Sequence, residues 1–345
     1  MNSSVNEEND QLSDIKHFVL NIKQLKSIVI LKSALKLFTC NTKFIFSLIL
    51  SILPFFIFMV FFEIKLQKTL IYLASNPLPN NPFAVEFAAY QSEDSDQNND
   101  ITEFLSDTFQ LSIFYLFIYP LLEFLSMILT MKLAINLVYV AEKQATFSPQ
   151  EVLEQDIKLK GSFMTYLYVH LLSTTTFLGL LCIVSYYIIF SSQLHSFDVL
   201  EFWMNVLWTA VHAVIFLGLL YKYLGWSVVW NMGVVISVKE EGTGIAALEL
   251  ASYYGKHSTK TGFELMLSFF VFGNVTRLAC LYAGLCNGSV AGVVITCIVV
   301  MLVSLVNLVK WVACLLHFDY CKQKTMEKKV DDQELGKPVN VADIS

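Results

Sequence analysis

Long apolar stretches separated by shorter polar connections dominate the pattern of hydrophobic and polar positions along this 345-residue chain. Most of them reach the roughly 20 apolar residues that a helix needs to cross a bilayer core of about 30 Å. A lone strand in hydrocarbon would leave backbone N–H and C=O groups unpaired, so each stretch is predicted to be helical. The fold class predicted is therefore an all-α integral membrane bundle of about six transmembrane helices. The predicted spans are residues 44–63, 109–131, 164–190, 203–222, 263–286 and 290–316.

Shorter cytosolic amphipathic helices are predicted between the spans. Ser148 to Glu151 reads as a capping box with proline at the first helical position, and Gly161 as the stop of that helix. Residues 244–254 carry apolar positions at helical spacing before Gly255 and Lys256. Residues 15–40 form a third, lysine-rich interfacial helix candidate.

Two interpretations of this arrangement stay open at this point. One is an internal repeat in which an interfacial helix leads into a two-span hairpin, starting near residues 25, 150 and 245. The other is that any six-span protein has helices between its spans. The fourth apolar stretch also continues to Val238, so that helix extends, kinks or packs a second apolar segment against the cytosolic side.

Composition agrees with a lipid environment, since 55% of residues are hydrophobic and only 15% are charged. The lysines gather in the N-terminal segment, the even-numbered connections and the C-terminal tail. By the positive-inside rule both termini then face the cytosol and the acidic loop 64–108 faces the other side. The first fourteen residues are polar and acidic, so we expect no cleavable signal peptide and expect the first span to act as the insertion signal.

The domain organisation predicted is one membrane domain with short tails. Its parts are a disordered cytosolic N-terminus at 1–14, the interfacial helix at 15–40, the six-span domain at 41–317 with its outer loop, and a disordered cytosolic tail at 318–345.

Ionisable residues inside the spans are the candidates for function, because each costs about 2.5–3.5 kcal/mol at mid-membrane on insertion scales. Glu123, His212 and Arg277 lie within roughly one helical turn of the same depth. A Glu123 to Arg277 ion pair would relieve both costs, and Pro120 would open the helix backbone one turn earlier. The alternatives are a structural pair and a transport or proton site.

The lysines near span ends and the cysteines receive simpler interpretations. Lys132, Lys222 and Lys310 fall near cytosolic span ends, where lysine can extend to the interface. The seven cysteines do not suggest a disulfide framework. Cys40 and Cys321, just cytosolic of the first and last spans, are candidates for palmitoylation, with plain packing as the alternative.

Known catalytic and cofactor-binding motifs are absent from the sequence. It has no H-E-x-x-H, G-x-S-x-G, P-loop or G-x-G-x-x-G pattern and no metal-spaced cysteine pair. The lysines border membrane and interleave with acids, which argues against nucleic-acid binding. We therefore expect no enzyme activity, no cofactor, no metal and no nucleic-acid partner.

One block of sequence resembles a known family. Trp230 and Asn231, the segment Ser237 to Glu240, the segment Gly244 to Leu248, and Gly255-Lys256 are similar to the most recognisable block of a plant family of uncharacterised multi-pass membrane proteins. That family is distantly similar to the membrane domain of bacterial glycerophosphodiester phosphodiesterases. The resemblance implies a six-helix membrane fold and a location in an endomembrane, such as the endoplasmic reticulum, or in the plasma membrane. We expect no soluble phosphodiesterase domain within these 345 residues.

Three functions follow as hypotheses. The first is a non-catalytic scaffold, adaptor or membrane organiser, whose partners are the lipid bilayer and cytosolic proteins. The alternative is a small-solute transporter or channel with a polar cavity near Glu123, His212 and Arg277. The third is an intramembrane enzyme, which requires Glu123 and His212 to meet on one cavity.

Overall fold

In the computed structural model, every regular element of the described residues is a helix. The structure describes residues 27–39, 42–75, 106, 109–143, 159–193, 199–240, 242–256, 258–285 and 290–334. The helices are α2 (Ser27–Thr39), α3 (Thr42–Ser75), the π-helical segment η2 (Phe114–Ile118), α6 (Tyr119–Lys143), α8 (Leu159–Gln193), α9 (Val199–Lys239), α10 (Ile245–Gly255), α11 (Thr259–Leu285) and α12 (Val290–Glu334). The predicted helical class is confirmed.

Within the described part of the chain, five helical stretches are long and apolar enough to cross a membrane. They are Phe109–Asn136, Leu159–Tyr187, Val206–Lys239, Thr259–Cys280 and Gly292–Lys329. Large apolar side chains cover the outside of the bundle, and Val214, Leu217 and Leu278 are each more than 60% exposed. Water would penalise such a surface and hydrocarbon would not. The helix over the first predicted span, α3, is not among the five.

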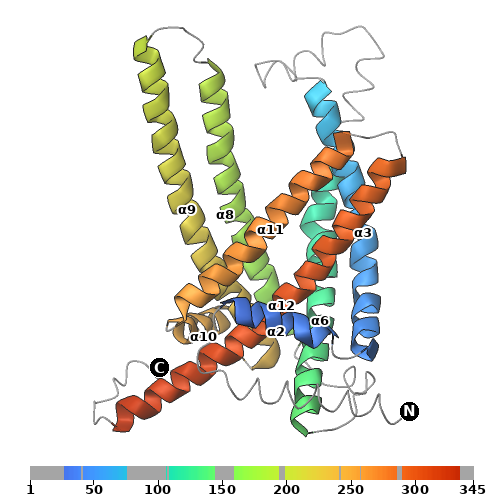
Figure 1. Cartoon of the computed structure of the whole chain (residues 1–345), viewed down its shortest axis with the longest axis vertical. Coiled ribbons are helices and arrows are strands. Elements are labelled where there is room, and N and C mark those ends of the chain that lie inside the picture. The colour runs from blue at the N-terminus through green and yellow to red at the C-terminus, as the bar shows by residue number, and fades with distance from the viewer. Residues whose placement is uncertain are drawn as a thin grey trace.

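The chain runs up and down through the bundle, and α12 lies at its centre (Figure 1). This helix contacts α2, α3, α6, α9, α10 and α11. By contrast, α8 packs mainly on α9, and the α8–α9 hairpin leans away from α3 and α12 towards the end opposite α10. The bundle therefore consists of a group organised by α12 and a hairpin that joins it chiefly at one end.

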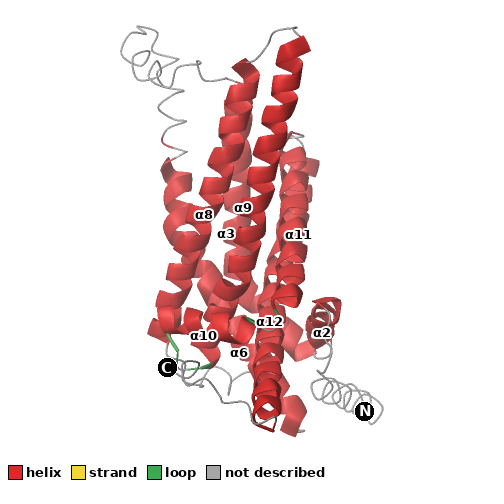
Figure 2. Ribbon diagram, turned by 90° about the vertical axis from the view of Figure 1, so that its left-hand side faces the viewer, coloured by secondary structure: helices red, strands yellow, loops and turns green. Residues whose placement is uncertain are grey.

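At that end, α2, α10 and the C-terminal part of α12 lie together (Figures 1 and 2). The short helix α2 crosses the bundle and buries Ile30 and Ala34. Its first residue fixes it to α11, since the Ser27 hydroxyl donates a hydrogen bond of 2.7 Å to the Glu264 carboxylate. We call this group of helix segments the terminal platform.

The predicted helix at 244–254 is confirmed as α10. Gly244 precedes it with a φ of 62°, a left-handed conformation that favours glycine. Its N–H donates to the Thr165 hydroxyl at 2.7 Å, and the Ser162 hydroxyl donates to the Ser237 carbonyl at 2.6 Å. These bonds join the start of α8 to the end of α9.

The structure selects among the alternatives for the fourth span and corrects two other predictions. Extension is the alternative observed for the fourth span, because α9 continues as one helix to Lys239. Gly161 does not stop a helix but lies in the first turn of α8, against Thr243; residues 144–158, with the predicted capping box, lie outside the described part. The tail predicted to be disordered from 318 is helical to Glu334. Burial of Phe318 and Cys321 stabilises this extension.

Contact between α9, α11 and α12 depends on a glycine. A Cβ at Gly262 would lie 2.5 Å from Val228 Cγ1 and 2.8 Å from His317 Nε2, and both neighbours are buried. We expect Gly262→Ala to destabilise the protein by about 1–3 kcal/mol through overpacking. The measurement is the apparent melting temperature of the purified protein in detergent.

Gly218→Ala is the matched control, because nothing lies within 4 Å of a Cβ at this position on α9. Alanine is the better helix former by up to about 1 kcal/mol, so this variant should be as stable as the parent or more so. Equal melting temperatures for the two alanine variants would contradict close packing at Gly262.

Candidate functional site

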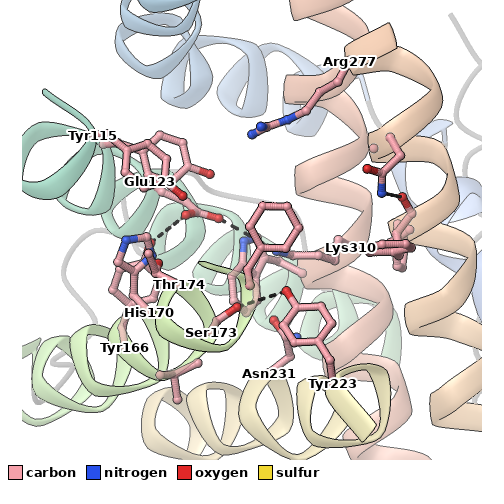
Figure 3. A pocket seen from close by; sticks show the side chains of 18 residues that line it. Tyr115, Glu123, Tyr166, His170, Ser173, Thr174, Tyr223, Asn231, Arg277 and Lys310 are labelled. Atoms are coloured by element: carbon pink, nitrogen blue, oxygen red, sulfur yellow. Dashed lines mark hydrogen bonds and ion pairs between the residues drawn. The ribbon is translucent and has the colours of Figure 1, made fainter. Parts of the chain in front are cut away.

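A polar cavity of about 360 Å³ lies between the α8–α9 hairpin and the rest of the bundle. Residues of η2, α6, α8, α9, α11 and α12 line it (Figure 3). Its volume is in the range of small-molecule sites. The polar lining includes Glu123, His170, Ser173, Thr174, Tyr223, Asn231, Arg277 and Lys310.

Glu123 is the central acid of this cavity and is 7% exposed. The Tyr166 hydroxyl donates a hydrogen bond of 2.7 Å to Glu123 Oε2, and Lys310 Nζ lies 3.8 Å from Oε1. Figure 3 shows both interactions as they converge on the carboxylate. Since the three residues belong to α6, α8 and α12, this one group connects three helices.

A widened helical turn precedes Glu123. The Tyr119 N–H donates to the Phe114 carbonyl, five residues back, which gives η2 its π-helical form. Pro120 follows directly and has no N–H for an α-helical bond. The expected opening of the backbone near Pro120 is therefore present in this region. It accompanies the placement of Tyr115 and Tyr119 on the cavity wall, and such turns are frequent at functional sites.

The histidine of the cavity is His170 rather than the predicted His212. The His170 ring lies 5.9 Å from the Tyr166 ring and 6.0 Å from the Tyr119 ring, between centroids. His212 does not line the cavity: its Nδ1 lies 3.0 Å from the Trp208 carbonyl and its ring packs on Trp208. A signal for His170 was available, because Tyr166, His170 and Ser173 share one helix face.

Arg277 does line the cavity with Glu123, as their matched depth suggested, but Glu123 forms its ion pair with Lys310. In Figure 3 Arg277 lies above that pair. Among the described residues no ion pair joins Glu123 to Arg277. The interpretation of Lys310 as a lysine that extends to the interface is wrong, because its ammonium lies beside Glu123 and 4.4 Å from the Trp311 ring centroid.

The structure describes one of the two candidate palmitoylation sites, Cys321. Cys321 is 1% exposed, and its Sγ lies 3.5 Å from His317 Nε2. Acylation would require this thiol to leave its packed position, so packing is the better account of it here. Cys40 lies outside the described residues, and its palmitoylation stays a prediction.

The described residues contain no cluster of three or more His, Cys, Asp or Glu side chains that could hold a metal ion. What the cavity offers instead is one carboxylate, two cations, an imidazole and several hydroxyl and amide groups. Such a set can bind a polar or charged molecule by hydrogen bonds and ion pairs inside the bundle.

Comparison with known proteins adds no relative: no family model, no curated protein and no solved structure matches the chain. The resemblance to the plant membrane family therefore stays a prediction.

A double-mutant cycle tests the Glu123 to Lys310 pair. Lys310→Met leaves a largely buried carboxylate without its cation and should lower the apparent melting temperature more than Glu123→Gln does. The double variant should lose less stability than the sum of the single variants, with a coupling of about 1 kcal/mol or more. Thermal unfolding in detergent provides the four values.

Lys222→Met crossed with Glu123→Gln is the control cycle, because Lys222 is exposed on α9 and does not line the cavity. The effects of these two substitutions on the apparent melting temperature should be additive. Additivity in the Lys310 cycle as well would show that the Glu123 carboxylate does not depend on that lysine.

Proposed function

We propose that the chain is a six-span integral membrane protein that binds a polar solute in the cavity and conducts it across the membrane, as a transporter or channel. The sixth span in this proposal is α3, whose apolar half precedes Glu63. The observation that carries the proposal is the convergence of Glu123, His170, Arg277 and Lys310, from four helices, on one cavity.

The physical argument is the cost of these groups in a membrane. A bundle that needed only stability would be served by apolar side chains at these positions, because a buried ion pair seldom stabilises more than well-packed hydrophobic residues. Ionisable residues within spans commonly mark substrate and ion pathways. Hydroxyl and amide groups around them add the hydrogen-bonding positions that a hydrated solute requires.

Access of water to the cavity tests the proposal. In a chain freed of its native cysteines, Thr174→Cys introduces a thiol on the cavity wall. We expect a membrane-impermeant thiol reagent, added separately from each side of sealed vesicles, to label it from at least one side. The reason is that labelling requires water to reach and ionise the thiol. Mass spectrometry of the intact protein measures the labelled fraction.

Leu171→Cys is the control on the same helix, one turn away, because Leu171 is 49% exposed and does not line the cavity. A thiol at this position would face lipid and should remain unlabelled. Absence of labelling at both positions, from both sides, would contradict an aqueous pathway.

The orientation we propose has both termini and the terminal platform in the cytosol and the acidic loop 64–108 on the opposite side. The lysine distribution supports it through the positive-inside rule. The even number of proposed spans requires the two termini to share one side.

Epitope tags test this orientation in sealed, right-side-out vesicles. Tags at residue 1 and after residue 345 should be protected from external protease, whereas a tag inserted near residue 95 should be cleaved. Each tag should be cleaved after detergent is added, which controls for intrinsic resistance. Opposite accessibility of the two terminal tags would exclude an even number of spans.

A scaffold or adaptor is the second candidate, and the terminal platform favours it. Two cross-helix ion pairs brace this end, Lys239 with Asp319 and Lys322 with Glu240. A rigid, charged surface of this kind suits cytosolic protein partners. Mutation of Arg277 distinguishes the two candidate functions. A scaffold should tolerate loss of the Arg277 charge, whereas a solute pathway should not.

The intramembrane-enzyme hypothesis named Glu123 and His212 as residues of one cavity, and of these two only Glu123 lines it. We propose a non-enzymatic role.

A further inference from the structure

We infer that the cavity is an oxyanion site, which binds a phosphate-class group through Lys310, the Trp311 indole N–H and Arg277. The inference rests on the proposed function and names the chemical class of its ligand. The group belongs either to a free anion or to a lipid headgroup, and the same donors would recognise both.

The first observation is an unused hydrogen-bond donor. Trp311 lines the cavity and is 2% exposed, and its Nε1 is buried with no hydrogen-bond partner among the residues that the structure describes. A buried N–H without an acceptor is unfavourable, so such groups are rare unless something else satisfies them. Because indole nitrogen only donates, the missing partner must carry an acceptor atom, such as a ligand oxygen.

The second observation is the cation beside that donor. Lys310 Nζ lies 4.4 Å from the centroid of the Trp311 ring, so the ammonium and the indole form one wall of the cavity. The contact of Lys310 with Glu123, at 3.8 Å, is looser than a charge-assisted hydrogen bond of about 2.8 Å. The ammonium therefore keeps N–H donors for a ligand.

The third observation is the charge balance of the lining. Among the described residues that line the cavity, one is a carboxylate, Glu123, and two are cations, Lys310 and Arg277. Glu123 is already held by the Tyr166 hydroxyl and Lys310, which leaves Arg277 as the cation that a ligand can neutralise. Glu63 on α3 is near enough to attract Arg277, but it does not line the cavity and forms no ion pair with it among the described residues.

Together these groups match a tetrahedral oxyanion. Arginine offers a planar set of donors to two oxygens, lysine offers a point charge, and the indole offers one directed N–H. A neutral or cationic ligand would leave the Arg277 charge without a counter-ion within the proposed span, which is unfavourable. The anion is therefore the class that relieves both the unpaired charge and the unused donor.

Binding to two probes tests the inference, with the full-length purified chain. Inorganic phosphate is titrated in detergent and followed by thermal shift. Phosphatidic acid is compared with phosphatidylcholine in mixed micelles, with bound lipid counted by native mass spectrometry. We expect binding of at least one anionic probe, and the probe that binds identifies the source of the group.

Three variants localise the binding. Arg277→Gln should weaken it about tenfold or more, as expected for loss of a charged donor. Trp311→Phe keeps an aromatic ring without the N–H and should weaken it about threefold to tenfold. Lys222→Gln removes a positive charge on α9 outside the cavity and should change affinity less than twofold.

Two results would overturn the inference: neither probe binds above the phosphatidylcholine background, or binding is equal in the parent, Arg277→Gln and Trp311→Phe. Because Arg277 is exposed and the phenylalanine is smaller than the indole, both variants should fold. Labelling of Thr174→Cys without anion binding would contradict the oxyanion site and remain consistent with the proposed pathway. Anion binding without labelling would contradict the pathway alone.

Discussion

The cost of charge in hydrocarbon is the constraint on which this bundle depends. Each ionised side chain in a span costs several kcal/mol unless another group of the protein neutralises or solvates it. Glu123 meets that requirement with partners from two other helices, the Tyr166 hydroxyl and the Lys310 ammonium. Since α8 otherwise packs mainly on α9, this carboxylate is one of the interactions that hold the α8–α9 hairpin to the helices around α12. The same polar junction that joins the two parts of the bundle also forms the wall of the cavity between them.

By contrast, the end of the bundle that carries the terminal platform depends on close apolar packing, to which α9 and α11 also contribute. Gly262 lets α11 approach Val228 of α9 and His317 of α12, and Phe318 is fully buried in the same region. Partly exposed ion pairs join the end of α9 and the residue after it to α12, and such pairs add little energy of their own. This end is closed by packing, while the hairpin leans away towards the other end. The position of the polar cavity follows from that asymmetry.

The candidate site was only partly predictable, and the reason is geometric. Depth along a span can be counted from the sequence, and two of the three residues with matched depth, Glu123 and Arg277, line one cavity. The direction that a side chain takes around its helix depends on which helices are neighbours. His212 has a suitable depth but points towards Trp208, whereas His170, which was not singled out, faces Glu123. The prediction for Lys310 failed for the same reason. Its position near a span end does not reveal that Glu123, on another helix, lies beside it.

The sequence by itself determined the helical class, the approximate extents of the long helices, and α10 with its glycine boundary. Those features follow from local chemistry: apolar runs of membrane length and the conformational preference of glycine. Only the tertiary structure decided that Glu123 pairs with Lys310 rather than Arg277, that His170 replaces His212, and that α12 stays helical to Glu334. In each case the deciding contact lies between helices far apart in the chain, and its geometry depends on helix rotation and crossing, which no local pattern encodes.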